Sequence, residues 1–117
     1  GVLEVLSEGV REAVVLLFAK RSVEFSAVPE DDTLSMREIE SLPEASAGHE
    51  VRVTSDDSLW SSFVGVRVRW GRAMTNHRGY RDGYQLEFAT CPSAIGDGVE
   101  LIVAASSIQL GTSRFGD

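Results

Sequence analysis

The sequence predicts an α+β fold, in which an antiparallel sheet of about six strands carries one main helix packed on one face. Short apolar or alternating segments recur along the chain and are separated by turn residues, which is typical of an antiparallel sheet. One segment, residues 56–64, instead carries the start and end signals of a helix. The length of 117 residues suits a single domain, residues 1–117, with one buried core.

The first third of the chain predicts a short helix and a meander. Residues 2–9 place apolar side chains roughly on one side and end in Gly9, which favours a short helix. Next comes a continuous apolar run, typical of a buried strand, and then two alternating segments typical of half-exposed strands. The three strands predicted for this meander are residues 12–20, 22–28 and 33–39.

The main helix is predicted at Asp56–Val64. Ser55 or Asp56 can cap its first turn, acidic residues favour its N-terminus, and Gly65 closes it. Trp60 and Phe63 fall at helical spacing, so we expect them to fix the helix on the sheet. A short strand, residues 50–55, is predicted before the helix, with Val51 and Val53 on one face.

A polar, glycine-bearing segment between two apolar strands predicts a hairpin. If Asn76 lies opposite Asp82, then Trp70 lies opposite Phe88 and Met74 opposite Tyr84, all on one face. Gly79 can take a positive φ in the turn. One or two further strands follow between Val99 and Leu110.

The tip of this hairpin holds more side-chain chemistry than a turn needs. A minimal hairpin uses about two loop residues. Loops on a rigid scaffold often carry binding residues, and Tyr and Arg are frequent interface anchors. We therefore expect a contact site, without catalysis, at His77, Arg78, Tyr80 and Arg81.

The net charge of −7 is uneven along the chain: residues 1–57 hold 13 acidic and 5 basic residues, and residues 58–117 hold 5 acidic and 6 basic ones. This disfavours nucleic acid as a partner, because binding phosphates draws on Lys and Arg. The acidic half serves solubility or binds a basic protein, such as a nuclease toxin. The acidic surface expected to make such contacts consists of Glu30, Asp31, Asp32, Asp56 and Asp57.

Residue patterns for catalysis are weak. Cys91 with His77 or His49 is the one possible Cys-His pair, and nothing nearby predicts a lowered thiol pKa. The acidic residues 30–32 lack the spaced oxygen ligands of a calcium loop. We therefore expect no catalytic residues, no metal and no cofactor. The alternatives are a small hydrolase or ligand-binding domain using the 75–82 loop, or a subunit of a larger assembly.

The sequence also bears on the cellular compartment. The longest apolar run, Ala13–Ala19, is far shorter than the roughly 18 residues of a membrane span. The N-terminal residues lack the pattern of a signal peptide, and the single cysteine provides no disulfide framework. We therefore expect a cytoplasmic protein that does not bind membranes.

A residue pattern, W-x(4)-TN-x(2)-GY-x-DG-x-QLEF, runs through the hairpin. Its members are Trp70, Thr75-Asn76, Gly79-Tyr80, Asp82-Gly83 and Gln85-Leu86-Glu87-Phe88, followed by Ala104–Ile108. This pattern resembles a family of small bacterial proteins known as a domain of unknown function. Small acidic proteins of this kind are similar to the immunity proteins of bacterial polymorphic-toxin systems. The resemblance thus implies a protein that binds and blocks a cognate toxin, and it carries over no catalytic residue. His77 and Arg78 depart from the Gln-like residues expected there, which implies a differently tuned loop.

Overall fold

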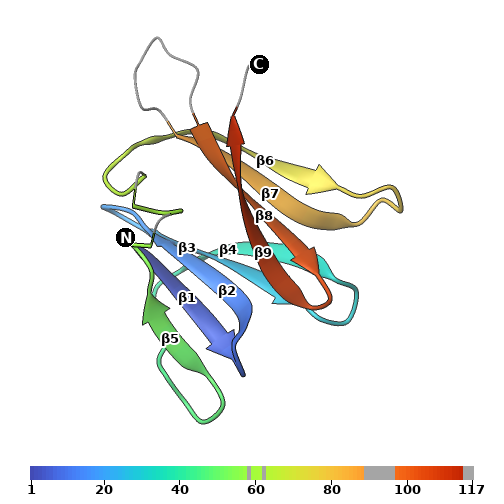
Figure 1. The fold of residues 1–117 in the computed structure, drawn as a ribbon, viewed down its shortest axis with the longest axis horizontal. Coiled ribbons are helices and arrows are strands. Elements are labelled where there is room, and N and C mark those ends of the chain that lie inside the picture. Colours follow the sequence, from blue (N-terminus) through green and yellow to red (C-terminus); the bar gives the residue numbers. More distant parts are fainter. Residues whose placement is uncertain (58, 62, 89–96, 115–117) are drawn as a thin grey trace.

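The protein is all-β in the part of the chain that the structure describes. The computed structural model describes residues 1–57, 59–61, 63–88 and 97–114. These residues form nine strands in two antiparallel sheets and contain no helix (Figure 1). The predicted α+β class is therefore wrong, although the prediction of antiparallel strands is confirmed.

The first sheet contains five strands. Their bounds are β1 Val2–Ser7, β2 Val10–Leu17, β3 Ser22–Val28, β4 Thr33–Ile39 and β5 Glu50–Val53. They lie in the order β4-β3-β2-β1-β5, so the chain runs as a meander through β4 and then returns to pair β5 with the free edge of β1. The predicted meander of three strands is thus confirmed as β2, β3 and β4.

Residues 2–9 form strand β1 and its turn, where the sequence predicted a short helix. Apolar residues at neighbouring positions fit a helix face, but they equally fit a strand inside a sheet whose two faces are both apolar. β1 is such a strand, because it pairs with β2 on one side and with β5 on the other. Its successive residues Val2 and Leu3, which point to opposite faces, are both buried. Glu8 and Gly9 have φ values of 51° and 81°, as expected for a tight two-residue hairpin turn.

The second sheet is a meander of four strands. Their bounds are β6 Val68–Thr75, β7 Arg81–Phe88, β8 Asp97–Ala104 and β9 Ser107–Arg114. They lie in the order β6-β7-β8-β9. Tyr84 and Phe88 share one face of β7 as predicted, and this face points into the core, because Leu86 and Phe88 are buried and Tyr84 packs against the buried cluster.

The β6–β7 hairpin exists, but its predicted register is wrong. Trp70 pairs with Glu87 and Met74 pairs with Gly83. The register shifts at two irregularities, between Val68 and Trp70 and between Met74 and Thr75. An irregularity of this kind moves the following side chains to the other face of the sheet. Trp70 accordingly lies on the outer face and is partly exposed, while Val68 packs against the core.

The predicted helix at Asp56–Val64 is replaced by a chain of turns. Hydrogen bonds join Trp60 N to Asp57 O, Phe63 N to Trp60 O and Val66 N to Phe63 O, at 3.0, 2.8 and 3.0 Å, and each spans three residues. Among the described residues of this segment, only the bond from Ser61 N to Asp57 O has the helical spacing of four. A segment this short gains little from helix propagation, so burial of Trp60 and Phe63 determines its path.

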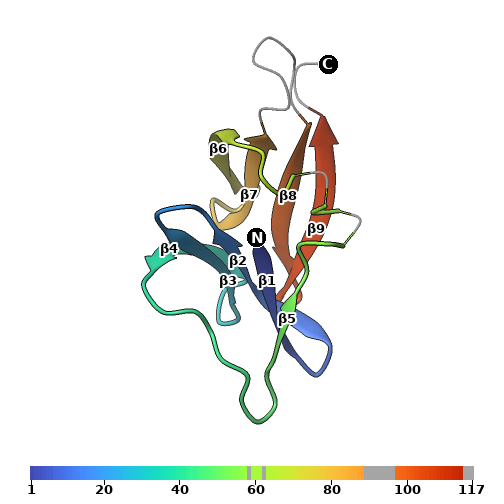
Figure 2. The ribbon, with the colours of Figure 1, turned by 90° about the vertical axis from the view of Figure 1, so that its left-hand side faces the viewer.

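The two sheets face each other across a shared apolar core (Figure 2). β2 packs against β9 and β4 packs against β7. The first sheet contributes Val2, Val14, Leu16, Phe25 and Leu34, the second contributes Leu86, Phe88, Val99, Leu101, Val103 and Ile108, and the connecting segment contributes Trp60 and Phe63. None of the described residues forms a helix long and apolar enough to cross a membrane.

Candidate functional site

The tip of the β6–β7 hairpin brings together the four contact residues predicted there. The side chains of His77, Arg78, Tyr80 and Arg81 are all exposed. Asn76 organises the loop, because its side-chain Oδ1 accepts hydrogen bonds from the backbone nitrogens of Arg78 at 2.9 Å and Tyr80 at 3.1 Å. Gly79 supplies the positive φ of 85°. The tip therefore presents an aromatic ring and cations on a backbone that is hydrogen-bonded to itself.

The five acidic residues predicted as one surface lie in two places. Glu30, Asp31 and Asp32 occupy the turn between β3 and β4, next to the pair Val28 and Thr33. Asp56 and Asp57 follow β5, which ends at Val53 beside Leu3. β5 and β4 are the opposite edges of the first sheet, and the β5 end points away from the β3–β4 turn. The acidic residues thus form two separate groups.

Two of these acids have structural partners. Asp31 Oδ1 accepts bonds from Thr33 N at 3.2 Å and from Thr33 Oγ1 at 2.7 Å, which closes its own turn. Asp32 Oδ1 accepts a bond from Ser106 N at 2.9 Å in the β8–β9 turn. Asp32 therefore ties one sheet to the other, a role that its place in an acidic run did not predict.

The largest feature that sequence reasoning missed is an apolar cleft between the sheets. Its larger lobe has a volume of about 670 Å³, within the roughly 300–1,000 Å³ of typical small-molecule sites. The register explains its floor: Leu16 pairs with Val23 across β2 and β3, and Phe25 pairs with Met36 across β3 and β4. Tyr84, Leu86 and Val68 form the facing wall. We call this space the inter-sheet cleft.

A glycine on β6 shapes the facing wall. The Tyr84 ring lies against Gly71, where an added Cβ would come 2.6 Å from Tyr84 Cε1. Tyr84 also contacts Phe25 of the opposite sheet, with ring centroids 5.3 Å apart. Because Gly71 has no side chain, the Tyr84 ring can occupy this space and contact Phe25 on the opposite wall of the cleft.

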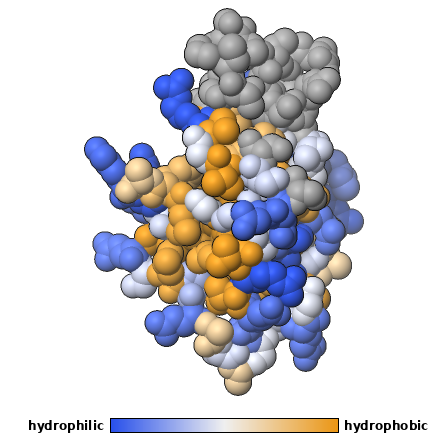
Figure 3. All heavy atoms as spheres, turned by 60° about the vertical axis from the view of Figure 1, so that its left-hand side comes forward, coloured by the Kyte–Doolittle hydropathy of each residue, from blue (hydrophilic) through white to orange (hydrophobic). Residues whose placement is uncertain are grey.

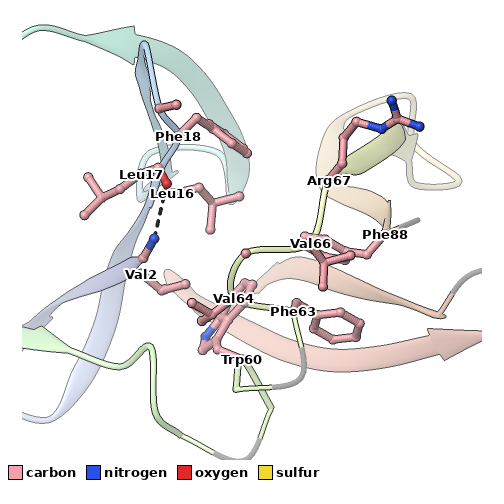
Figure 4. Close-up of a pocket in the computed structure, with 13 residues that line it drawn as sticks. Val2, Leu16, Leu17, Phe18, Trp60, Phe63, Val64, Val66, Arg67 and Phe88 are labelled. Carbon is pink, nitrogen blue, oxygen red and sulfur yellow. Dashed lines mark hydrogen bonds between the residues drawn. The ribbon is translucent and has the colours of Figure 1, made fainter. Parts of the chain in front are cut away.

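The smaller lobe adjoins the larger one and shares Leu16, Phe18, Ala19 and Arg67 with it. Its volume is about 360 Å³. In Figure 4, Leu16 and Phe18 lie on one side of this lobe, and Val66 and Phe88 lie on the other. Phe63 stacks on Phe88 with a centroid separation of 4.4 Å, which ties the connecting segment to the second sheet.

The mouth of the cleft exposes apolar side chains. Phe18 is 42% exposed and Met36 is 50% exposed. Both line the cleft, and Val64, which lines the smaller lobe, is exposed as well. Figure 3, which brings forward the left-hand side of Figure 1, shows apolar side chains gathered on one face. Contiguous apolar surface of this kind is typical of binding sites.

Four cations surround this mouth. Lys20 and Arg21 lie in the β2–β3 turn, Arg37 lies on β4, and Arg67 precedes β6. Glu38 is the only acidic residue among the described residues that line either lobe. The cleft therefore has a basic rim in a chain whose net charge is −7.

The remaining candidates for chemistry are dispersed. His49 Nε2 lies 3.3 Å from Glu12 Oε2, whereas His77 lies on the β6–β7 tip. Cys91, the nucleophile of the possible Cys-His pair, lies outside the described residues. Within the described part of the chain, no group of three or more His, Cys, Asp or Glu side chains is arranged to hold a metal ion.

Comparison with known proteins identifies a family. Residues 2–114 match a family of unknown function, DUF6334. Because the match covers nearly the whole chain, the protein belongs to this family. No curated protein and no solved structure shows a significant match.

Proposed function

We propose that this member of DUF6334 is a non-catalytic binding protein whose main binding element is the inter-sheet cleft. The supporting observation is that both sheets leave a connected apolar space between them, with Phe18 and Met36 at its mouth. Covering each of these half-exposed side chains would contribute about 1 kcal/mol to binding. A cytoplasmic location is part of the proposal, because the chain has one cysteine.

Binding of the neutral dye Nile red tests the cleft directly. Wild-type protein should raise the dye's emission, and Ala19→Trp should weaken its binding at least tenfold, because Ala19 is exposed and borders both lobes. Ala45→Trp is the matched control, since Ala45 is exposed on the β4–β5 connection and does not border the cleft. Far-UV circular dichroism checks that both variants fold. Equal dye binding by the two variants would contradict the proposal.

A narrower function, that of an immunity protein, is favoured by the β6–β7 tip. Its loop is held by Asn76, so Tyr80 and Arg81 can contact a protein partner at a low entropic cost. The two acidic groups, around Asp32 and Asp56, would draw a basic toxin toward the protein and mainly accelerate association. In this form of the proposal the chain blocks a cognate toxin.

Co-expression with the product of the neighbouring gene tests this narrower function. We expect the wild-type chain to restore the growth of cells that are poisoned by that product. The double variant Tyr80→Ala, Arg81→Ala should lose protection, whereas Arg52→Gln on the distant strand β5 should keep it. A neighbouring product that is harmless, or toxicity that the wild-type chain does not relieve, would contradict the immunity function and leave the cleft proposal standing.

A further inference from the structure

The walls of the inter-sheet cleft fit a long apolar chain. The described residues that form them are mainly aliphatic and aromatic, and they come from both sheets. The two lobes share Leu16 and Phe18, so apolar surface is continuous from one lobe to the other. A hydrocarbon chain can bury its whole length against such a surface without leaving a polar group unpaired.

The basic rim of the cleft favours a negative charge at the other end of that ligand. Arg37 already forms an ion pair with Glu24, in which Arg37 Nε lies 3.0 Å from Glu24 Oε1. Lys20, Arg21 and Arg67, in contrast, form no ion pair with any described residue. In Figure 4 the Arg67 guanidinium lies at the edge of the lobe, outward of Val66 and Phe88, where it can meet a head group that remains near water.

We infer that the inter-sheet cleft binds a single-chain amphiphile with an anionic carboxylate head, that is, a free fatty acid. This inference rests on the proposed binding function and adds the class of ligand. The hydrocarbon chain lies between the two sheets, and the carboxylate lies at the rim beside Arg67, Lys20 and Arg21. The acidic net charge of −7 would repel an anion elsewhere on the molecule, so the basic rim directs the head group to this mouth.

Isothermal titration with two matched series of amphiphiles tests both parts of this inference. The first series is octanoate, decanoate and dodecanoate, and affinity should rise about fourfold for each methylene that becomes buried. The second series holds the chain constant and compares dodecanoate, 1-dodecanol and dodecyltrimethylammonium, all below their aggregation concentrations. Dodecanoate should bind several-fold more tightly than the alcohol, and the ammonium should bind most weakly.

Charge variants locate the head group. The triple variant Lys20→Gln, Arg21→Gln, Arg67→Gln should reduce dodecanoate binding to the level of the alcohol and leave alcohol binding unchanged. Arg52→Gln is the control, because Arg52 lies on β5 and pairs with Glu50 at 3.2 Å, away from the rim. The preference for dodecanoate should also shrink at 0.5 M salt, where a Debye length of only a few ångströms, about 4 Å, screens exposed charges.

The outcomes separate this inference from the proposed function. Alcohol and carboxylate binding with equal affinity would overturn the fatty-acid inference but support the apolar cleft. Binding of a Leu- and Glu-rich peptide, with no binding of dodecanoate, would overturn the inference in favour of a protein segment as the occupant. If neither Nile red nor any amphiphile binds, both the inference and the cleft proposal are wrong.

Discussion

A single buried carboxylate, that of Glu4, connects three parts of the molecule. Glu4 is only 4% exposed, yet it lies on β1 among apolar neighbours. Its Oε1 lies 2.5 Å from Arg11 Nε, and its Oε2 accepts a bond of 3.2 Å from Trp60 Nε1. Arg11 Nη1 in turn donates to Ile108 O at 3.0 Å. The cluster thus joins the first sheet, the connecting segment and strand β9.

Removing this carboxylate should be costly. Glu4→Ala leaves the buried Trp60 Nε1–H and the partly buried Arg11 Nε–H without their carboxylate acceptor, so we expect the free energy of unfolding to fall by about 3 kcal/mol. Glu50→Ala is the matched control, because it breaks a pair whose two side chains are more than half exposed. That pair should contribute less than about 1 kcal/mol. Urea titration measures both values, and equal losses would contradict the assigned role of Glu4.

At the scale of elements, sequence patterns predicted where strands lie better than they predicted which strands pair with each other. The strands at residues 22–28 and 33–39 and the shared face of Tyr84 and Phe88 were predicted correctly, because a period of two is a local signal. The helix predicted at residues 2–9 failed because neighbouring apolar residues occur both on a helix face and in an interior strand. Pairing of β1 with β2 and β5 decides between the two, and this pairing is long-range.

The second helix failed for a different physical reason. Asp56 and Gly65 lie at the two ends of the segment as expected, but start and end signals do not by themselves specify a continuous helix between them. Trp60 and Phe63 are buried three residues apart, and the backbone between them follows three-residue turns. Tertiary burial therefore overrode local helix propensity, which is a small energy per residue.

The same difference between local and long-range structure separates the two parts of the candidate site. The β6–β7 tip was predictable because its contact residues, 77–81, are neighbours in the sequence. The inter-sheet cleft was not, because Leu16 and Phe25 meet Tyr84 and Leu86 only after both sheets have formed. Arg67 was not among the predicted site residues, because its place on the rim depends on where strand β6 starts, at Val68.

At the scale of the whole molecule, one apolar core joins both sheets. Phe25 of the first sheet and Leu101 of the second belong to the same buried cluster, and Trp60 of the connecting segment lies inside it. The cleft occupies one end of this interface, and Asp32 and Ser106 tie the two sheets together at their adjacent turns. Neither sheet can therefore unfold without exposing the apolar face of the other.

This shared core predicts a single cooperative unfolding transition. Trp60 is 1% exposed and reports on the core, whereas Trp70 lies on the outer face of β6. In the variant Trp70→Phe, tryptophan fluorescence should follow Trp60 alone, and far-UV circular dichroism should follow both sheets. We expect the two signals to give the same midpoint and the same slope in urea, because loss of the core removes the support of each sheet. Fluorescence that changes before the circular dichroism would instead show two separately folding units, and the prediction of one domain would then be wrong.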